Sequence, residues 1–244
     1  DYLPDLKKLI RYHDKPISTI SYFLQSLIYK QMKKDNIKIS ITGNGADELF
    51  TGYYHHYNLF YKILKNKSDK SKFIQEWNEN ISPLIRNKEY KNIFQKNIKT
   101  YFTLLDDKYL KKIKLKNYAE KKLSNNILRN KMLNELLYQT VPLALIDDDL
   151  NAMYYSIENR SPYLNSDLYR FLINSPVSYF VNNGYAKSIL RESLKRVSPK
   201  HVLENYEKIG FNISADKLIN FQSKKIINFI NKKSSIFLII KKKA

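Results

Sequence analysis

The chain has 244 residues, of which 43% are hydrophobic and 14% aromatic, and it contains no cysteine. This composition excludes an intrinsically disordered chain, and the lack of cysteine excludes disulfides, thiolate metal sites and a cysteine nucleophile within these residues. The formal net charge of +20 comes mostly from lysines spread along the chain. We interpret this charge as compositional bias and not as a nucleic-acid surface, although a basic surface also attracts polyphosphates.

The first elements predicted along the chain are a helix over residues 17–34 and a strand over residues 37–42. The helix is indicated by apolar residues at helical spacing, which are Ile20, Phe23, Leu24, Leu27, Ile28 and Met32. The β-branched strand runs into a turn with Gly43 and Gly45, and an apolar segment that can be helical follows. This order predicts part of an α/β unit, in which ligands bind beyond the carboxyl ends of strands.

After residue 52 the pattern becomes almost entirely helical. Residues 65–72 and 106–126 are rich in lysine and are expected to be solvated loops or helix faces. We divide the chain into residues 1–215 and a basic helical tail, 216–244. The apolar run Ile236–Ile240 is far shorter than the roughly 20 residues that span a bilayer, so we expect no membrane segment here and a cytoplasmic protein.

The carboxylates after the glycine turn allow two interpretations. Asp47 lies where the first turn of the next helix should be, and helix N-terminal amides favour anions, so Asp47 can simply cap that helix. Alternatively, it holds Mg²⁺, which prefers hard oxygen ligands and often bridges to phosphates. Farther along the chain, Lys208 stands before Ile209-Gly210-Phe211, and a flexible point charge beside a turn suits charge neutralisation on pyrophosphate.

A second acidic segment is the run Asp147-Asp148-Asp149. Three consecutive carboxylates repel one another unless they are exposed, bound to a cation or at the start of a helix. Composition alone favours an exposed charged loop, while a helix that opens at Asp149 and buries Met153 and Ile157 is the alternative. Glu158 and Arg160 are two residues apart and would not face each other on a helix, so we expect them to have separate partners. For His55 and His56, adjacent positions on a helix argue against a shared metal ion.

Together, these segments resemble the synthetase domain of the glutamine-hydrolysing asparagine synthetase family, which includes the β-lactam synthetase type. The first family motif, Ser-Gly-(Asp/Glu)-Gly-x-Asp-Glu-x-Phe-x-Gly-Tyr, is matched by Thr42-Gly43, Gly45, Asp47-Glu48, Phe50 and Gly52-Tyr53. Further matches are His13-Asp14-Lys15-Pro16; Asp149, Met153, Ser156, Glu158, Arg160 and Pro162-Tyr163-Leu164; Lys187 and Leu190-Arg191; and Lys208-Ile209-Gly210-Phe211. Their order and spacing over residues 13–211 make the resemblance specific.

The resemblance implies a partial parallel sheet of the adenine-nucleotide alpha-hydrolase-like (PP-loop) type, with a large helical C-terminal part. It also implies ATP and Mg²⁺ as cofactors. The carboxylate of an aspartate-like substrate would be adenylated and then amidated by ammonia from a glutaminase domain outside this chain, and a homodimer is expected from the family. By the same resemblance, Asp47 would bind Mg²⁺, and Lys208 and Glu48 would be catalytic. The nucleotide-binding residues would be Thr42, Gly43, Asn44, Gly45, Lys187 and Arg191.

Several positions depart from the family pattern. Asn44 replaces an acidic residue linked to the nucleophile, and an amide cannot act as a general base; Ala152, Asn165 and Tyr206 are the other departures. The phosphate-binding motif Ser-Gly-Gly-x-Asp-Ser is absent from the 244 residues. We therefore expect the back portion of a longer enzyme, inactive by itself. The alternatives are an inactive or split-gene remnant that serves as an interaction lobe, or a basic helical nucleic-acid-binding protein.

Overall fold

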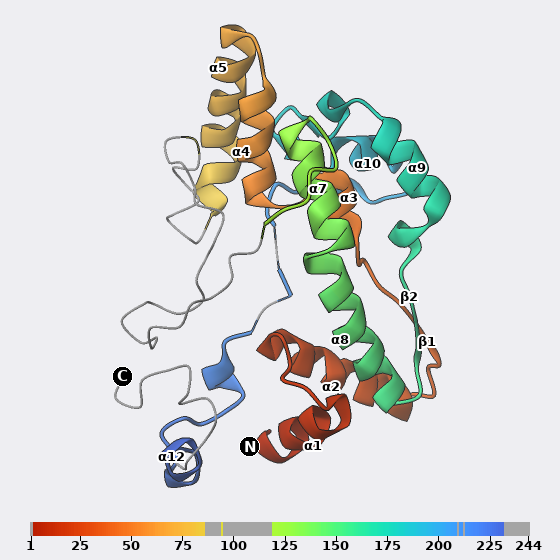
Figure 1. Ribbon diagram of the computed structural model, residues 1–244, viewed down its shortest axis with the longest axis vertical. Coiled ribbons are helices and arrows are strands. Elements are labelled where there is room, and N and C mark those ends of the chain that lie inside the picture. The colour runs from red at the N-terminus through yellow and green to blue at the C-terminus, as the bar shows by residue number, and fades with distance from the viewer. Residues whose placement is uncertain (1, 86–93, 95–118, 209, 212, 232–244) are drawn as a thin grey trace.

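The computed structural model describes residues 2–85, 94, 119–208, 210–211 and 213–231 (Figure 1). Most of the lysine-rich segment 106–126 and the last thirteen residues of the predicted tail, 232–244, lie outside these ranges. The predicted class is confirmed in its coarse form, because the described chain is a mostly helical α/β structure with a small parallel sheet.

The N-terminal part consists of α1 (Leu3–His13), α2 (Ile20–Lys34) and the short strand β1 (Ile39–Ile41). The helix predicted over residues 17–34 therefore begins three residues later than expected, with Thr19 as its N-cap. Its buried face is centred on Phe23, Ser26 and Tyr29, whereas Ile28 is 47% exposed. Tyr29 belongs to the buried face because its hydroxyl reaches a polar group on another helix, as described below.

The strand predicted over residues 37–42 pairs only over Ile39–Ile41. Its parallel partner is β2 (Glu158–Arg160), with Ser40 opposite Asn159. Residues two apart on a strand share a face, and Arg160 Nε accordingly lies 2.8 Å from Glu158 Oε1. The expectation that these two side chains have separate partners was thus wrong, because it assumed a helix. A second, antiparallel pair joins β3 (Val181–Asn182) to β4 (Tyr185–Ala186).

The helices after β1 build the larger part of the molecule. In chain order they are α3 (Ala46–Phe50), α4 (Tyr54–Ile63), α5 (Lys67–Glu76), α7 (Ile127–Leu137), α8 (Thr140–Tyr154), α9 (Ser166–Asn174), α10 (Ser188–Ser193), α11 (Lys200–Leu203) and α12 (Lys224–Asn231). The helix α8 runs lengthwise between the α1–α2 pair and the region of α3, α4 and α7 (Figure 1). Among the described residues, none of these helices is both long and apolar enough to cross a membrane.

Two apolar clusters lie toward the two ends of α8. The larger is built from α3, α4, α5, α7 and the β3 region, with Phe50, Trp77, Leu128 and Phe180 buried at its centre. The smaller joins α1 and α2 to residues 213–226 around Phe23. Because the apolar side chains of the short helix α3 are buried in the larger cluster, this packing fixes the glycine turn and the residues that follow it.

Candidate functional site

The glycine turn is joined to the end of the neighbouring strand. The backbone N–H of Thr42 donates to the carbonyl of Arg160 at 2.8 Å, and the Thr42 hydroxyl lies 3.0 Å from that of Ser161. Gly45 has a φ of +85°, and a side chain there would overlap Leu164. A glycine is therefore required by both backbone conformation and space. Two segments singled out separately in the sequence, 40–53 and 158–164, thus form one structural unit.

Asp47 is held by two lysines from distant parts of the chain. Lys187 Nζ lies 2.5 Å from its Oδ1, and Lys208 Nζ lies 2.5 Å from its Oδ2. Burial alone would raise the pKa of Asp47, but the ammonium groups of Lys208 and Lys187 outweigh burial and hold it below its usual value. The carboxylate is therefore ionised at neutral pH and can act as an oxygen ligand.

Asp47, Lys187 and Lys208 line a pocket of about 220 Å³ together with Gly52, Tyr54, Tyr57, Ala186, Arg191, Tyr206 and Glu207. Ligand pockets for whole small molecules usually measure about 300–1,000 Å³. The smaller volume suits a chain of phosphates better than a complete nucleotide. Four of the residues predicted from sequence to bind nucleotide, metal or pyrophosphate meet here, and three of them are cations.

Lys187 and Arg191 reach this pocket in different ways. Lys187 has a φ of +58° directly before α10, an uncommon conformation for a residue with a side chain. Arg191 donates to the backbone carbonyls of Ala186 at 2.9 Å, Leu203 at 2.6 Å and Asn205 at 2.9 Å. The guanidinium thus anchors the segment that leads to Lys208.

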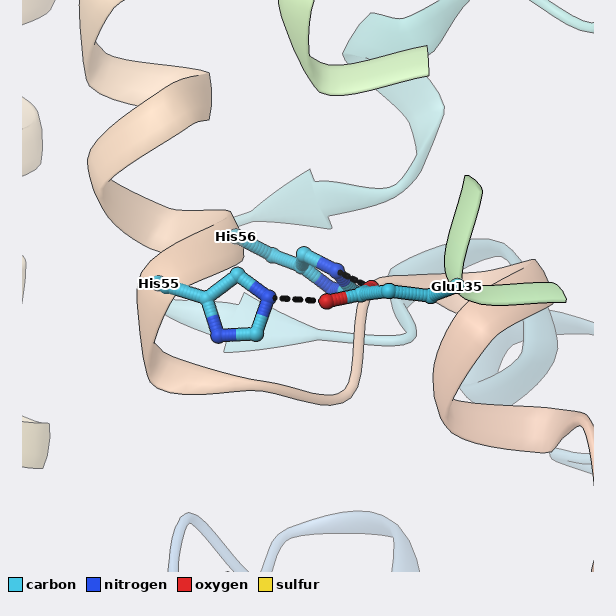
Figure 2. Close-up of side chains that lie close together, drawn as sticks. All are labelled: His55, His56 and Glu135. Carbon is cyan, nitrogen blue, oxygen red and sulfur yellow. Dashed lines mark hydrogen bonds and ion pairs between the residues drawn. The ribbon is translucent and has the colours of Figure 1, made fainter. Parts of the chain in front are cut away.

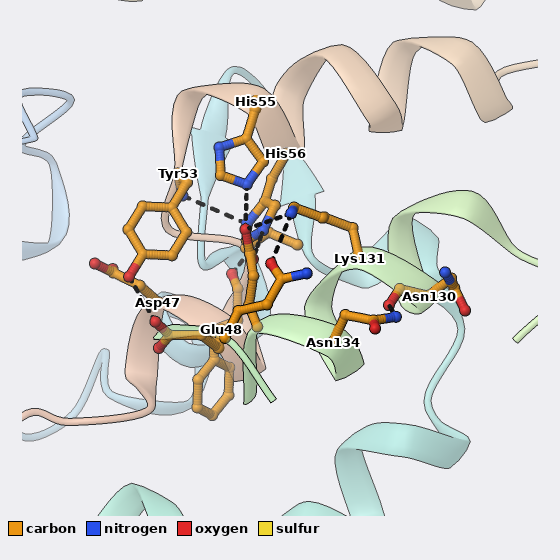
Figure 3. A network of polar contacts seen from close by, with 12 residues as sticks. Asp47, Glu48, Tyr53, His55, His56, Asn130, Lys131 and Asn134 are labelled. Carbon is orange, nitrogen blue, oxygen red and sulfur yellow. Dashed lines mark hydrogen bonds and ion pairs between the residues drawn. The ribbon is translucent and has the colours of Figure 1, made fainter. Parts of the chain in front are cut away.

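Glu48 points away from the pocket, although Asp47 lines it. Consecutive residues of a helix point about 100° apart, and Glu48 is buried with its carboxylate accepting a 2.5 Å hydrogen bond from the Tyr53 hydroxyl (Figure 3). Burial raises the pKa of Glu48. The Lys208 ammonium lies 4.4 Å from the centroid of the Tyr53 ring, so the structure links Glu48 to the pocket through Tyr53, a residue whose role sequence reasoning missed.

The remaining predicted residues of the turn do not line this pocket. Thr42, Gly43, Asn44 and Gly45 lie before α3, whereas the pocket forms on the side of Asp47 and Gly52. Asn44 instead donates from Nδ2 to Asp148 Oδ2 at 2.7 Å. Within the described residues, the predicted nucleotide site is therefore divided between the turn and the cationic pocket.

The acidic run 147–149 is not an exposed loop. Asp147 and Asp148 are 0% and 1% exposed in the middle of α8, while Asp149 is exposed and does not begin the helix. Asp147 pairs with Lys15, and Asp148 accepts hydrogen bonds from other elements. The predicted loop and the predicted helix start at Asp149 were both wrong because the buried carboxylates have partners more than 100 residues away, which local composition does not reveal.

The side chains of His55, His56 and Glu135 form a second polar cluster (Figure 2), and the two histidines belong to a wider polar network with Tyr53 and Glu48 (Figure 3). His55 Nε2 lies 2.6 Å from Glu135 Oε1 and His56 Nε2 lies 2.7 Å from Oε2, and the metal-ligating atoms of all three lie within 4.8 Å of one another. The adjacent histidines do converge, contrary to the helical argument, because both rings turn toward the one carboxylate on α7.

The protonation state of His56 nevertheless favours a hydrogen bond to Glu135 over metal binding. Burial lowers the pKa of His56 to about 4, and its Nδ1 accepts from the backbone N–H of Tyr53 at 3.4 Å. A neutral imidazole has one acceptor nitrogen, so Nε2 carries the proton and donates to Glu135. The ammonium of Lys131 lies 3.6 Å from Glu135 Oε1 and also helps to compensate the negative charge of this carboxylate.

Two comparisons with known proteins found matches to this chain. A family model described as asparagine synthase matches residues 1–233. The chain is 24% identical over 246 aligned residues to asparagine synthetase [glutamine-hydrolyzing] 1 of Bacillus subtilis (strain 168); this alignment covers 87% of the chain and 36% of that relative. The chain thus spans about a third of the length of this relative. No solved structure matches.

Proposed function

Because the chain belongs to the asparagine synthase family, we propose that it is part of an ATP-dependent, glutamine-hydrolysing amidotransferase that converts aspartate to asparagine. The proposal depends above all on one observation: Asp47, Lys187 and Lys208 come from three separate segments and meet in one small cationic pocket. Such a pocket suits the phosphates of ATP and the pyrophosphate that leaves when a carboxylate is adenylated.

In this reaction the substrate carboxylate attacks the α-phosphorus of ATP, and the bond to pyrophosphate breaks. Ammonia then attacks the acyl carbon, and AMP leaves with its electron pair. Lys208 and Lys187 would bind the pyrophosphate oxygens and neutralise the charge that develops on them. Arg191 would hold the backbone that presents Lys208, since its donors are occupied by carbonyls.

Asp47 fits a magnesium ligand in its chemistry, because it is an ionised carboxylate beside a cationic pocket. Mg²⁺ typically binds one or two protein carboxylates and completes its shell with water and phosphate oxygens. When bound, the ion would neutralise phosphate charge. Before the nucleotide binds, the ion pairs with Asp47 would keep the two lysines in place. Once it binds, its phosphates would compete with Asp47 for these lysines.

The other parts of the proposal follow from the family. The turn at 42–45 would contact the nucleotide or the acyl-adenylate, with Glu48 supporting Tyr53. Ammonia would come from a glutaminase domain outside this chain, the enzyme would be a cytoplasmic homodimer, and no nucleic acid would bind. Residues 1–215 would carry the synthetase function, with 216–244 as a tail.

The test is ATP–pyrophosphate exchange by the full-length protein, with and without aspartate. We expect aspartate-dependent exchange, reduced at least 100-fold by Lys208→Met, on the scale of removing one preorganised donor. Lys195→Met is the matched control, since Lys195 pairs with Glu192 outside the pocket. The 244-residue chain alone should show no exchange, because it lacks Ser-Gly-Gly-x-Asp-Ser.

Three results would contradict this proposal. A full-length protein without exchange for any carboxylate would favour an inactive interaction lobe. Salt-dependent RNA or DNA binding, without stabilisation by ATP, would favour the nucleic-acid-binding alternative. An unchanged rate of exchange in the Lys208→Met variant would show that the activity does not depend on the cationic pocket.

A further inference from the structure

The carboxylate of Asp148 is buried and fully engaged by neutral donors. Its Oδ1 accepts from the Tyr29 hydroxyl and from Gln25 Nε2, both at 2.5 Å, and its Oδ2 accepts from Asn44 Nδ2 at 2.7 Å. Gln25 and Tyr29 lie on α2, whereas Asn44 lies in the glycine turn. Asp148 therefore ties the turn to two helices.

No ion pair among the described residues includes Asp148, although Asp147 beside it pairs with Lys15. A buried carboxylate outside any ion pair depends on its hydrogen bonds. The donor at position 44 is consequently not interchangeable with an acceptor. An acidic side chain there would place a carboxylate oxygen against Asp148 Oδ2, and two carboxylates so close cannot both ionise.

We propose that Asn44 and Asp148 are a matched pair in which Asp148 is a positioning residue that orients the Gly43–Gly45 turn through the Asn44 amide. Asn44, which departs from the family motif, is then required by Asp148. Its presence does not by itself indicate that the site has lost its function. Whether the turn binds an adenylate rests on the proposed function, but the pairing does not.

The pairing predicts a specific dependence between two substitutions. Asn44→Asp alone creates two facing carboxylates, which must share a proton. Asn44→Asp with Asp148→Asn keeps one charge and one hydrogen bond and reverses the donor and the acceptor. The second substitution should therefore rescue the first.

The number of protons bound by the Asn44→Asp variant also predicts how its stability changes with pH. In the Asn44→Asp protein the folded state would bind a proton that the unfolded state releases above a pKa of about 3.9, so its stability should fall as pH rises. Titratable groups near Asp148 include Tyr22 and Tyr29 from α2, of which Tyr22 also interacts with Glu48 of α3, and its chain neighbours Asp149 and Asp147, the latter with its partners His13 and Lys15. These groups are common to all the variants, so their contributions cancel in the comparison.

The experiment is urea unfolding of the full-length protein, its two single variants and the double variant, at pH 5 and pH 8. We expect Asn44→Asp to lower the folding equilibrium constant at least tenfold at pH 8, which corresponds to one pKa unit or about 1.4 kcal/mol, and by less at pH 5. The double variant should regain most of the stability that Asn44→Asp loses. Asn44→Ala, which removes the donor without adding a second carboxylate, should show a smaller difference between the two pH values than Asn44→Asp.

Hydrogen exchange measures the positioning itself. Asn44→Ala should speed exchange at residues 43–45, and Asp148→Asn should do so less, because an amide at position 148 can still bond to Asn44. Additive effects of the two substitutions, a pH-independent Asn44→Asp effect, or unchanged exchange in Asn44→Ala would each overturn the proposal. If Asn44→Asp does not fold, recovery of folded protein in the double variant still tests the coupling. None of these measurements requires the protein to adenylate a substrate.

Discussion

The carboxylate of Asp47 occupies the space in which a side chain at position 52 would lie. A Cβ built on Gly52 would overlap Asp47 Oδ1, Cγ and Cβ. Gly52 is thus required by the close approach of Asp47, which lets that carboxylate turn toward Lys187 and Lys208.

Gly52→Ala should therefore displace Asp47 from its two lysines. We expect a loss of stability of about 1–3 kcal/mol, the usual cost of overpacking, and at least tenfold weaker pyrophosphate binding, because the cationic pocket loses its shape. Urea unfolding and isothermal titration calorimetry measure the two effects. Gly43→Ala is the control for stability, since a Cβ at Gly43 meets no atom within 4 Å; equal destabilisation by the two substitutions would contradict the packing argument.

The left-handed conformation of Lys187 leads to a prediction in which stability and binding separate. A residue with a side chain in this region costs about 1–2 kcal/mol relative to glycine. Lys187→Gly and Lys187→Ala both remove the ammonium, but only glycine relieves the backbone. We expect the glycine variant to be more stable by about 1 kcal/mol, while both variants bind pyrophosphate equally weakly. Thermal unfolding and calorimetry would show whether the two variants differ in stability alone.

The cluster around Glu135 should make the protein sensitive to acid. The pKa of His56 is about 4 in the folded protein, against 6.5 for an unperturbed histidine, so the unfolded state takes up a proton first, and stability falls as pH decreases from 6.5 to 4. Burial would raise the pKa of Glu135, but its hydrogen bonds with His55 and His56 lower it far below its usual value of 4.5. The stability that Glu135 contributes is therefore fully present above pH 4.5 and is lost progressively below it.

Urea unfolding between pH 4 and pH 7 checks this dependence. His56→Gln, which keeps a side-chain N–H donor without a titrating ring, should flatten the profile between pH 6.5 and 4. His201→Asn is the control, since His201 is exposed, and it should leave the slope unchanged. An unaltered slope in His56→Gln would show that other groups determine the acid response.

The same cluster should not bind zinc strongly, despite its ligand types. Metal binding at His56 Nε2 would displace the proton given to Glu135 and would oppose the Tyr53 N–H on the other nitrogen. We expect Zn²⁺ at micromolar concentration to leave the melting temperature unchanged at pH 7. Micromolar binding that disappears in Glu135→Gln but persists in His201→Asn would show that the cluster is a metal site.

Sequence patterns predicted the elements whose signals are local. The helix over α2, the turn at Gly43–Gly45 and the strand before it follow from spacing, glycine and β-branched residues within a short window. The motif match also brought Asp47, Lys187 and Lys208 into one hypothesis, and the structure places their charged atoms in contact. The functions assigned to these residues remain predictions.

Features that depend on distant partners were not predictable in this way. The burial of Asp147 and Asp148 requires knowledge of Lys15, Tyr29 and Asn44. Glu158 and Arg160 pair because β1 draws residues 158–160 into a strand, while their own sequence is equally compatible with a helix. The orientation of Glu48 away from the pocket depends on the rotation of α3 within the apolar cluster, which no single residue type specifies.

The contacts that build the candidate site have a consequence for how the chain reaches its native state. The bonds Asn44–Asp148, Thr42–Ser161 and Asp47–Lys208 join residues 104, 119 and 161 positions apart. Closing such large loops costs entropy before the contacts compensate for it, and it slows folding. During synthesis, the segment with Asp47 leaves the ribosome long before its lysine partner at 208. The local helices can therefore form early, whereas the charged pocket must be among the last parts of the molecule to assemble.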